Sequence, residues 1–257
     1  MEEIRNLILA VEPGQLTAAG AWKLPIAHLA YRMGDGPHLF RANTPITPTG
    51  GWMVVDDTRF SQGDGAEGFC NEVLRECAAR KFTGVGCLFR GRESAVLADA
   101  AGRLSEACKG REIDCYVTEA YGLSAPAAKV ILPTAISGGS LQVRLEEAAA
   151  RFGKRLALWV ERVAEDFLLP SPSGAGAPLT AEELHRRRAE RGGAVFFSPE
   201  LCAHYFTYMA GDKGHFVLFD DAGSIRKKLR MAAGLGVDTA FLPYDSTADV
   251  LGELVGK

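Results

Sequence analysis

The sequence has no apolar run near the ~20 residues that a membrane-spanning helix needs. Its start, MEEIRNLILAVEPGQ, places two acids before a short apolar segment, whereas a secretory signal begins with basic residues and has a longer apolar stretch. A basic surplus is also missing, since 29 Lys and Arg stand against 32 Asp and Glu. We therefore expect a cytoplasmic protein with no signal peptide, no membrane span and no nucleic-acid partner.

The common cofactor and metal motifs are absent as well. No Gly-x-Gly-x-x-Gly follows the first apolar segment, and neither GxxxxGK[ST] nor GxSxG occurs anywhere. The histidines share no metal-ligand spacing, and the six cysteines form no CxxC pair. We expect no cofactor and no metal, and we expect the cysteines to be buried, reduced thiols.

The chain does show a regular alternation of strand-length apolar segments with amphipathic helical segments. Strands are predicted at 4–11, 26–31, 52–55, 84–89, 113–118, 129–132, 156–160 and 239–242, and 204–219 reads as a hairpin around Gly-Asp-Lys-Gly. The Pro- and Gly-rich stretch 168–178 is predicted as a loop. Helices are predicted at 141–152, capped by Ser140, and from a capping box at Thr180 to an end at Gly192 and Gly193. This pattern favours a single (β/α)8 TIM barrel domain over residues 1–257, with a β-hairpin insertion before the last helix and strand. A doubly wound open sheet is the alternative.

In such a barrel, ligands meet the carboxyl ends of the strands. The polar residues predicted there form a pocket for a polyol or a cation, although charges are also expected wherever strands meet solvent. Trp159 is able to stack on a sugar, but a packed core indole is the commoner role of Trp. The ligand-binding candidates are Glu12, Asp56, Asp57, Arg90, Trp159 and Tyr244, with Asp245 beside Tyr244, and the candidate replacement acids are Glu119 and Glu161.

The second half of the chain, and above all its last quarter, carries a family resemblance. Two segments, TAISGGSLQVRLEEAAARFG and YFTYMAGDKGHFVLFDDAGSIRKKLRMAAGLGVDTAFL, resemble the bacterial spore-type branch of glycoside hydrolase family 18, the chitinase family. The resemblance implies a barrel that takes β-linked N-acetylhexosamine glycans such as chitin or peptidoglycan. Asp220 and Asp221 are expected to be structural, because acids ahead of a helix cap its amides. The elements that match are Phe219, Asp220, Asp221, Ser224, Ile225, Lys228 and Gly236.

The chain departs from that family at its signature, DGxDxDxE on the fourth strand. The corresponding segment is Phe82 to Arg90, and it keeps only the Phe and the first Gly. Arginine cannot donate a proton at neutral pH, so the resemblance implies a pseudoenzyme that lacks the usual catalysis. The Trp that floors the family's sugar site has no counterpart near Leu242 or Pro243. The acids of the signature are replaced by Thr83, Gly86, Leu88 and Arg90.

Three functions remain open at this point. The barrel binds a glycan or a partner protein without hydrolysing it, or it is an active glycoside hydrolase with relocated carboxylates, Glu119 first and Glu161 second. The third alternative, a structural or assembly protein of a sporulating cell, comes from the resemblance alone. The sequence leaves the oligomeric state open.

Overall fold

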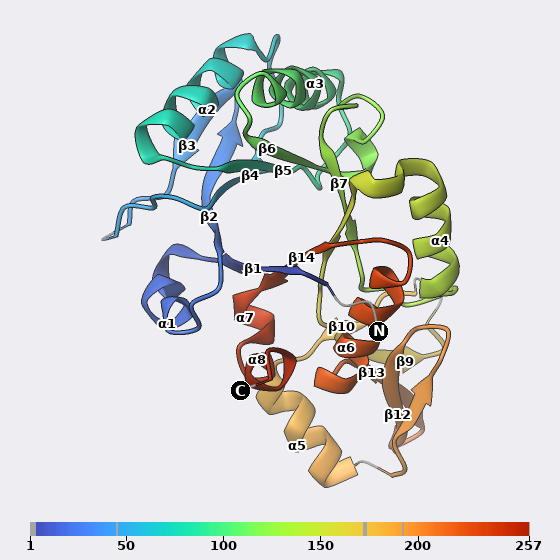
Figure 1. Cartoon of the computed structure of the whole chain (residues 1–257). Helices are drawn as coiled ribbons and strands as arrows, with labels where there is room; N and C mark the ends of the chain where they lie inside the picture. Colours follow the sequence, from blue (N-terminus) through green and yellow to red (C-terminus); the bar gives the residue numbers. More distant parts are fainter. Residues whose placement is uncertain (1–3, 45, 172–173, 192, 257) are drawn as a thin grey trace.

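Eight parallel strands are arranged in a ring with helices around it (Figure 1). The computed structural model describes residues 4–44, 46–171, 174–191 and 193–256. Pairing of β14 with β1, and of β1 with β2, closes the sheet, so the predicted (β/α)8 TIM barrel is confirmed and the open sheet is excluded. The barrel strands are β1 (Asn6–Val11), β2 (Ile26–Gly34), β4 (Trp52–Arg59), β5 (Gly84–Leu88), β6 (Asp114–Thr118), β7 (Lys129–Pro133), β8 (Leu156–Trp159) and β14 (Thr239–Pro243).

The outer layer contains α2 (Glu67–Arg80), α3 (Ala95–Lys109), α4 (Leu141–Phe152) and α6 (Ala222–Ala233), with the short α1 (Leu16–Gly20), α7 (Tyr244–Thr247) and α8 (Leu251–Leu254). Side-chain caps fix where α3 and α4 start: Ser94 accepts from the Leu97 amide at 3.2 Å, and Ser140, the predicted cap, accepts from the Val143 amide at 3.4 Å. In the described part of the chain, no helix has the length and apolar character needed to cross a membrane.

The chain between β8 and α6 forms a separate antiparallel sheet, which lies toward the bottom of Figure 1. The predicted hairpin is confirmed as β12 (Ala203–Ala210) and β13 (Lys213–Phe219), but it belongs to a five-stranded sheet with β9 (Ala164–Leu169), β10 (Ala177–Pro178) and β11 (Phe196–Ser198), beside α5 (Ala181–Arg191). The loop prediction for 168–178 is wrong at both ends, because β9 pairs with β13 and β10 pairs with β9. Its Pro172 and Ser173, and the predicted helix end at Gly192, lie outside the described residues.

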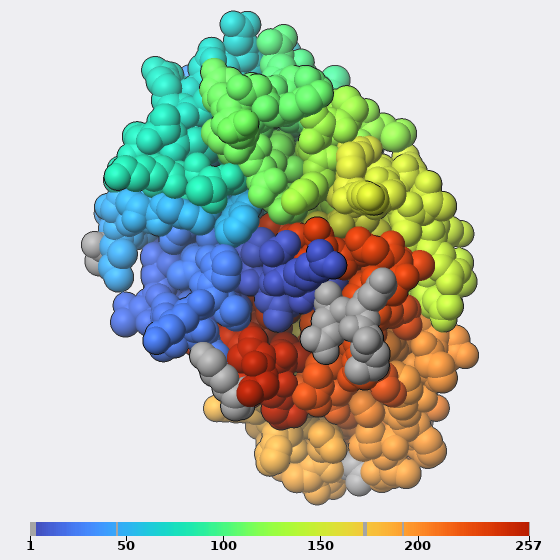
Figure 2. All heavy atoms as spheres, viewed as in Figure 1, coloured from blue at the N-terminus to red at the C-terminus, as the bar shows by residue number. Residues whose placement is uncertain are grey.

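The ring is packed with side chains, and Figure 2 shows atoms filling most of it on the face in view. The interior cluster contains Leu88, Trp159 and Phe241, while a second cluster lies between the strands and the outer helices. The six cysteines are buried and free, as predicted. The apolar residues of the interior are Ile8, Ala10, Ala27, Val54, Leu88, Tyr116, Ile131, Ala157, Trp159 and Phe241.

Gly84 leaves the space that the Trp52 indole occupies inside the barrel. A methyl group at Gly84 would overlap Trp52, whereas one at Gly86 would meet Val54 Cγ2 at an ordinary 3.5 Å. We expect Gly84→Ala to lower the free energy of unfolding by about 1–3 kcal/mol, the usual cost of overpacking, and Gly86→Ala to lower it much less. Urea denaturation of the two variants measures this, and equal losses would contradict the packing described for Trp52.

Candidate functional site

A cleft of about 360 Å³ opens at the barrel mouth, where β5, β6 and β7 end. Its walls carry Arg90 after β5, Glu119 after β6, Glu161 after β8 and Arg144 from α4. The carboxyl ends of parallel strands converge at one end of a barrel, which is why residues so distant in sequence meet here. Three of the predicted site residues, Arg90, Glu119 and Glu161, are therefore brought together.

Each predicted replacement acid in the cleft is paired with an arginine. Arg90 Nη1 lies 2.6 Å from Glu161 Oε1, and Arg144 Nη2 lies 3.1 Å from Glu119 Oε2. The four side chains are 32–42% exposed, so both pairs are open to solvent and stabilise the fold only weakly. The cleft therefore offers charged hydrogen-bond donors and acceptors to a ligand.

Asp57 fixes the backbone that carries Arg90. This carboxylate is buried, and its two oxygens accept the amides of Arg90 and Gly91, both at 2.9 Å. Asp56 and Asp57 were expected directly after a strand ending at 55, and that boundary is wrong because β4 continues to Arg59 by pairing with β2. The consequence is that Asp57 points its oxygens at the loop after β5.

Trp159 lies within the packed interior, 3% exposed. Its ring stacks on Phe241 with centroids 5.9 Å apart and planes 24° apart. The guanidinium carbon of Arg90 lies 5.0 Å from the centroid of the indole. Trp159 is thus a core indole whose contacts include one charged residue of the cleft.

The side chains of β5, the fourth barrel strand, that face the interior are not ionisable. A Cβ at Gly84 would meet Trp52 and one at Gly86 would meet Val54, which both belong to or pack on the interior cluster. Leu88 is a member of that cluster and is 8% exposed. No carboxylate therefore enters the barrel from this strand.

A second group of predicted residues lies outside the lining of this cleft. Burial raises the pKa of Glu12, Asp245 and Asp56 raise it further, and the positive charge of Arg32 opposes the increase. Arg32 Nε lies 3.4 Å from Asp56 Oδ2. Tyr244 begins α7 and is half-buried against the outer core. Among the described residues, no three His, Cys, Asp or Glu side chains are placed to hold a metal ion.

Glu12 provides a pH-dependent test of this geometry. A carboxyl whose pKa is raised in the folded state stabilises the fold at low pH, and that contribution is lost as the pH rises above about 4. We therefore expect Glu12→Gln to raise the Tm at pH 7 and to change it little at pH 3.5. The exposed Glu93→Gln serves as control for the substitution itself. A Glu12→Gln variant that is less stable at pH 7 than at pH 3.5, relative to the native chain, would contradict the raised pKa of this carboxyl.

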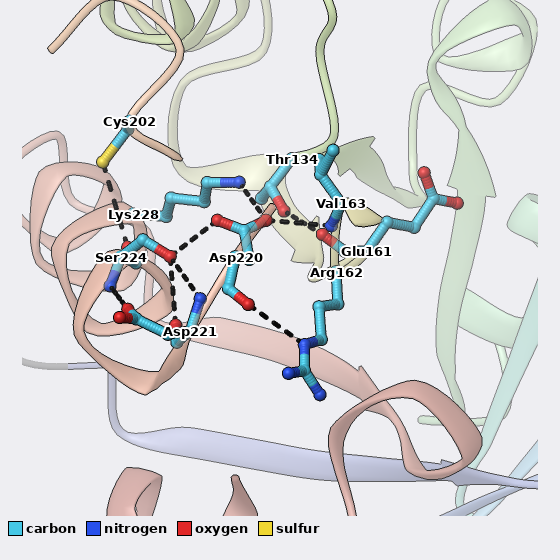
Figure 3. Close-up of polar contacts among 9 residues, drawn as sticks. All are labelled: Thr134, Glu161, Arg162, Val163, Cys202, Asp220, Asp221, Ser224 and Lys228. Atoms are coloured by element: carbon cyan, nitrogen blue, oxygen red, sulfur yellow. Dashed lines mark hydrogen bonds and ion pairs between the residues drawn. The ribbon is translucent and has the colours of Figure 1, made fainter. Parts of the chain in front are cut away.

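A buried polar network centred on Asp220 lies behind the cleft (Figure 3). The sequence predicted a structural role for Asp220 and Asp221 but not the ion pair. Lys228 Nζ lies 2.6 Å from Asp220 Oδ2, and both side chains are fully buried. Asp220 also accepts from Ser224 Oγ at 2.7 Å and from the Val163 amide at 3.0 Å. Asp221 caps α6 through a capping box with Ser224, as predicted for this acid pair, whereas Asp220 is the ion-pair partner.

The same network anchors the segment that presents Glu161. Arg162 Nε donates to the Asp220 carbonyl at 3.1 Å, and Thr134 Oγ1 donates to the Glu161 carbonyl at 3.4 Å (Figure 3). The one sequence signal for this network was a lysine on an otherwise apolar helix face, where Ile225, Lys228 and Leu229 follow one another at helical spacing.

Known proteins resemble this chain in fold and not detectably in sequence. No protein-family model and no curated protein matches the sequence. Structural neighbours are glycoside hydrolase family 18 chitinases and spore cortex-lytic enzymes. The spore cortex-lytic enzyme SleL of Bacillus cereus matches 99% of this chain and 75% of its own, with a TM-score of 0.71 and 14% identity.

Two chitinases match along nearly their whole length. The Chromobacterium violaceum chitinase has a TM-score of 0.70 and 14% identity, covering 98% of this chain and 99% of its own. The family 18 chitinase of Cycas revoluta, solved with an N-acetylglucosamine trimer, has a TM-score of 0.63 and 11% identity, covering 97% of each chain. The TM-scores show that these proteins share a chitinase-type barrel fold with this chain. Because the sequence identities are this low, the chemistry of the site has to be argued from its own residues.

Proposed function

We propose that this chain binds an N-acetylhexosamine glycan at the cleft between the ends of β5, β6 and β7, and that it lacks the acid-assisted hydrolysis of family 18. One observation carries the proposal: β5 presents Gly84, Gly86 and Leu88 to the interior. Side chains of a strand alternate every two residues, so the next position in this series is Arg90, which lines the cleft at the barrel mouth. General acid catalysis is typically worth about 10²–10⁴ in rate, and an arginine cannot supply it.

The glycan part of the proposal is supported by the fold and by the chemistry of the cleft. The Cycas revoluta chitinase was solved with N-acetylglucosamine oligomers, and SleL is named for acting on spore cortex. Arg90, Arg144, Glu119 and Glu161 offer hydrogen-bond donors and acceptors to sugar hydroxyl and acetamide groups. A chitin- or peptidoglycan-like chain is therefore the ligand class that we propose, and an association with spores would follow from the peptidoglycan version.

Calorimetric titration with chitin oligomers and with peptidoglycan fragments tests the binding. We expect saturable binding to at least one of them, and Glu119→Gln to weaken it by about tenfold, the equivalent of 1.4 kcal/mol. Gln142→Ala, on the exposed surface of α4, is the control and should bind as the native chain does. An absence of binding to every saccharide would overturn the proposal.

A second candidate function, hydrolysis with relocated carboxylates, is favoured by Glu12 alone. Desolvation and the neighbouring acids Asp245 and Asp56 raise its pKa while Arg32 opposes the increase, and an upward shift is the direction that a general acid requires. If Glu12 protonates the leaving group, Glu12→Gln lowers kcat on a fluorogenic chitobioside by about 10²–10⁴. Turnover equal to buffer in the native chain, or unchanged in Glu12→Gln, would eliminate this candidate.

A further inference from the structure

A second cavity, of about 430 Å³, lies outside the ring of barrel strands, between α2 and β3 (His38–Arg41). The strand β3 pairs antiparallel with β2 and lies beside α2 (Figure 1). The volume of this cavity is within the range of small-molecule sites. None of its lining residues belongs to the cleft at the barrel mouth, so the two are separate places on the molecule.

Two arginines and one glutamate give the cavity a positively charged lining. Arg41 Nη1 and Arg80 Nε each lie 3.2 Å from Glu76 Oε1. Tyr31 donates its hydroxyl to the same oxygen at 3.0 Å, and burial raises the pKa of Tyr31, so the phenol is a neutral donor. One carboxylate charge therefore faces two guanidinium charges, and one positive charge of the lining is left uncompensated.

Most hydrogen-bond donors of the two arginines are unused. A guanidinium has five N–H groups, and Arg41 and Arg80 each donate one to Glu76. In the part of the chain that the structure describes, no other acceptor contacts either guanidinium. The two side chains are 40% and 27% exposed, so their remaining N–H groups are within reach of a ligand. Asn43 adds an exposed side-chain amide to the same lining.

The two guanidiniums are held in place by contacts between β3 and α2. Glu76 joins Arg41 of the strand to Arg80, which lies one turn further along the helix. The strand is itself tied to the helix by Glu72, whose Oε2 accepts the Leu39 amide at 2.7 Å. A ligand that binds here therefore loses little affinity to the ordering of protein side chains.

We propose that this cavity binds a phosphoryl group, either as inorganic phosphate or as the phosphate of a small monoester. The planar forks of two guanidiniums match the several terminal oxygens of a tetrahedral oxyanion, whereas the two oxygens of a carboxylate are satisfied by one guanidinium. Leu39, which is half-buried in the lining, provides an apolar wall for the carbon atoms of a monoester. This inference is independent of the glycan cleft.

Calorimetric titration at constant ionic strength tests the inference, with inorganic phosphate, glucose 6-phosphate and acetate as the three ligands. We expect saturable binding of phosphate and weaker binding of acetate. Tighter binding of glucose 6-phosphate than of phosphate would assign the site to monoesters, and equal or weaker binding would assign it to phosphate itself. Both results support a phosphoryl site.

Arg41→Gln is expected to weaken phosphate binding by about tenfold, because it removes one of the two guanidiniums. Arg75→Gln is the matched control, since it removes an exposed charge of α2 that does not line this cavity, and it should bind phosphate as the native chain does. A Tm close to that of the native chain shows that Arg41→Gln is folded, as expected for an exposed side chain. Arg80→Gln is the second variant and should weaken binding in the same way.

Three results would overturn the inference. The first is an absence of saturable phosphate binding by the native chain. The second is phosphate binding that Arg41→Gln and Arg80→Gln leave unchanged, which would place the ion elsewhere, for example at Arg90 of the cleft. The third is acetate binding as tight as that of phosphate, which would contradict the phosphoryl class. None of these results bears on the glycan proposal.

Discussion

Replacement of Lys228 by Met is expected to lower the free energy of unfolding by about 3–5 kcal/mol, since it leaves the Asp220 carboxylate buried without its cation. For a chain of this length, that loss corresponds to a Tm lower by roughly 10 °C. The carboxylate keeps Ser224 Oγ and the Val163 amide as donors, but neither carries a charge. Thermal and urea denaturation of the native chain and the variant measure the effect.

Two further variants show whether the loss comes from an unpaired charge. The double variant Asp220→Asn with Lys228→Met removes both charges and should recover much of the stability, as paired replacements of buried ion pairs often do. Asp221→Ala removes only the cap of α6 and should cost about 1 kcal/mol. A Lys228→Met variant within 1 kcal/mol of the native chain would contradict the buried pair.

Leu88→Asp is expected to be the other strongly destabilising change, by about 3 kcal/mol or more at pH 7. The new carboxyl would enter a cluster that contains Tyr116, Ile131, Trp159 and Phe241. The two cations that contact these rings, Arg90 and Lys129, already have acidic partners. Burial would raise the pKa of this carboxyl above its unfolded value near 4, so the variant should lose stability as the pH rises above about 4.

Leu88→Asn separates the charge from the change of shape. It has nearly the same volume as Asp and does not ionise, so the difference in stability between the two variants should be small at pH 4 and large at pH 7. Equal stability of the two variants at pH 7 would mean that the end of β5 is hydrated enough to hold the aspartate of the family signature. That result would remove the main argument against family 18 catalysis.

The barrel itself was predictable because its signals are local. The eight barrel strands were each predicted from an apolar run, and α4 was predicted to the residue from its spacing and its Ser140 cap. The strands β9 and β10 were missed in part, since Leu168 and Leu169 precede proline and Ala177 is followed by one. Their extended conformation depends on pairing with distant strands, which composition does not reveal.

The location of the candidate site was predictable from the sequence, but its ion pairs and hydrogen bonds were not. The convergence of strand ends placed Arg90, Glu119 and Glu161 at one mouth, as the barrel topology requires. The arginine that pairs with Glu119 comes from α4, and a helical position gives no sign of reaching toward a strand end 25 residues earlier. The structural partnership of Asp57 with the Arg90 amide was equally hidden, since it joins a side chain of β4 to a backbone amide of the loop after β5.

Saturation-transfer difference NMR of the N-acetylglucosamine tetramer, followed for a day in the presence of the protein, tests binding without hydrolysis in one sample. We expect difference signals from the sugar rings and no new reducing-end resonances. Growth of reducing-end signals beyond those of the tetramer alone would contradict the loss of hydrolysis at the fourth strand, and an absence of difference signals would contradict the glycan site.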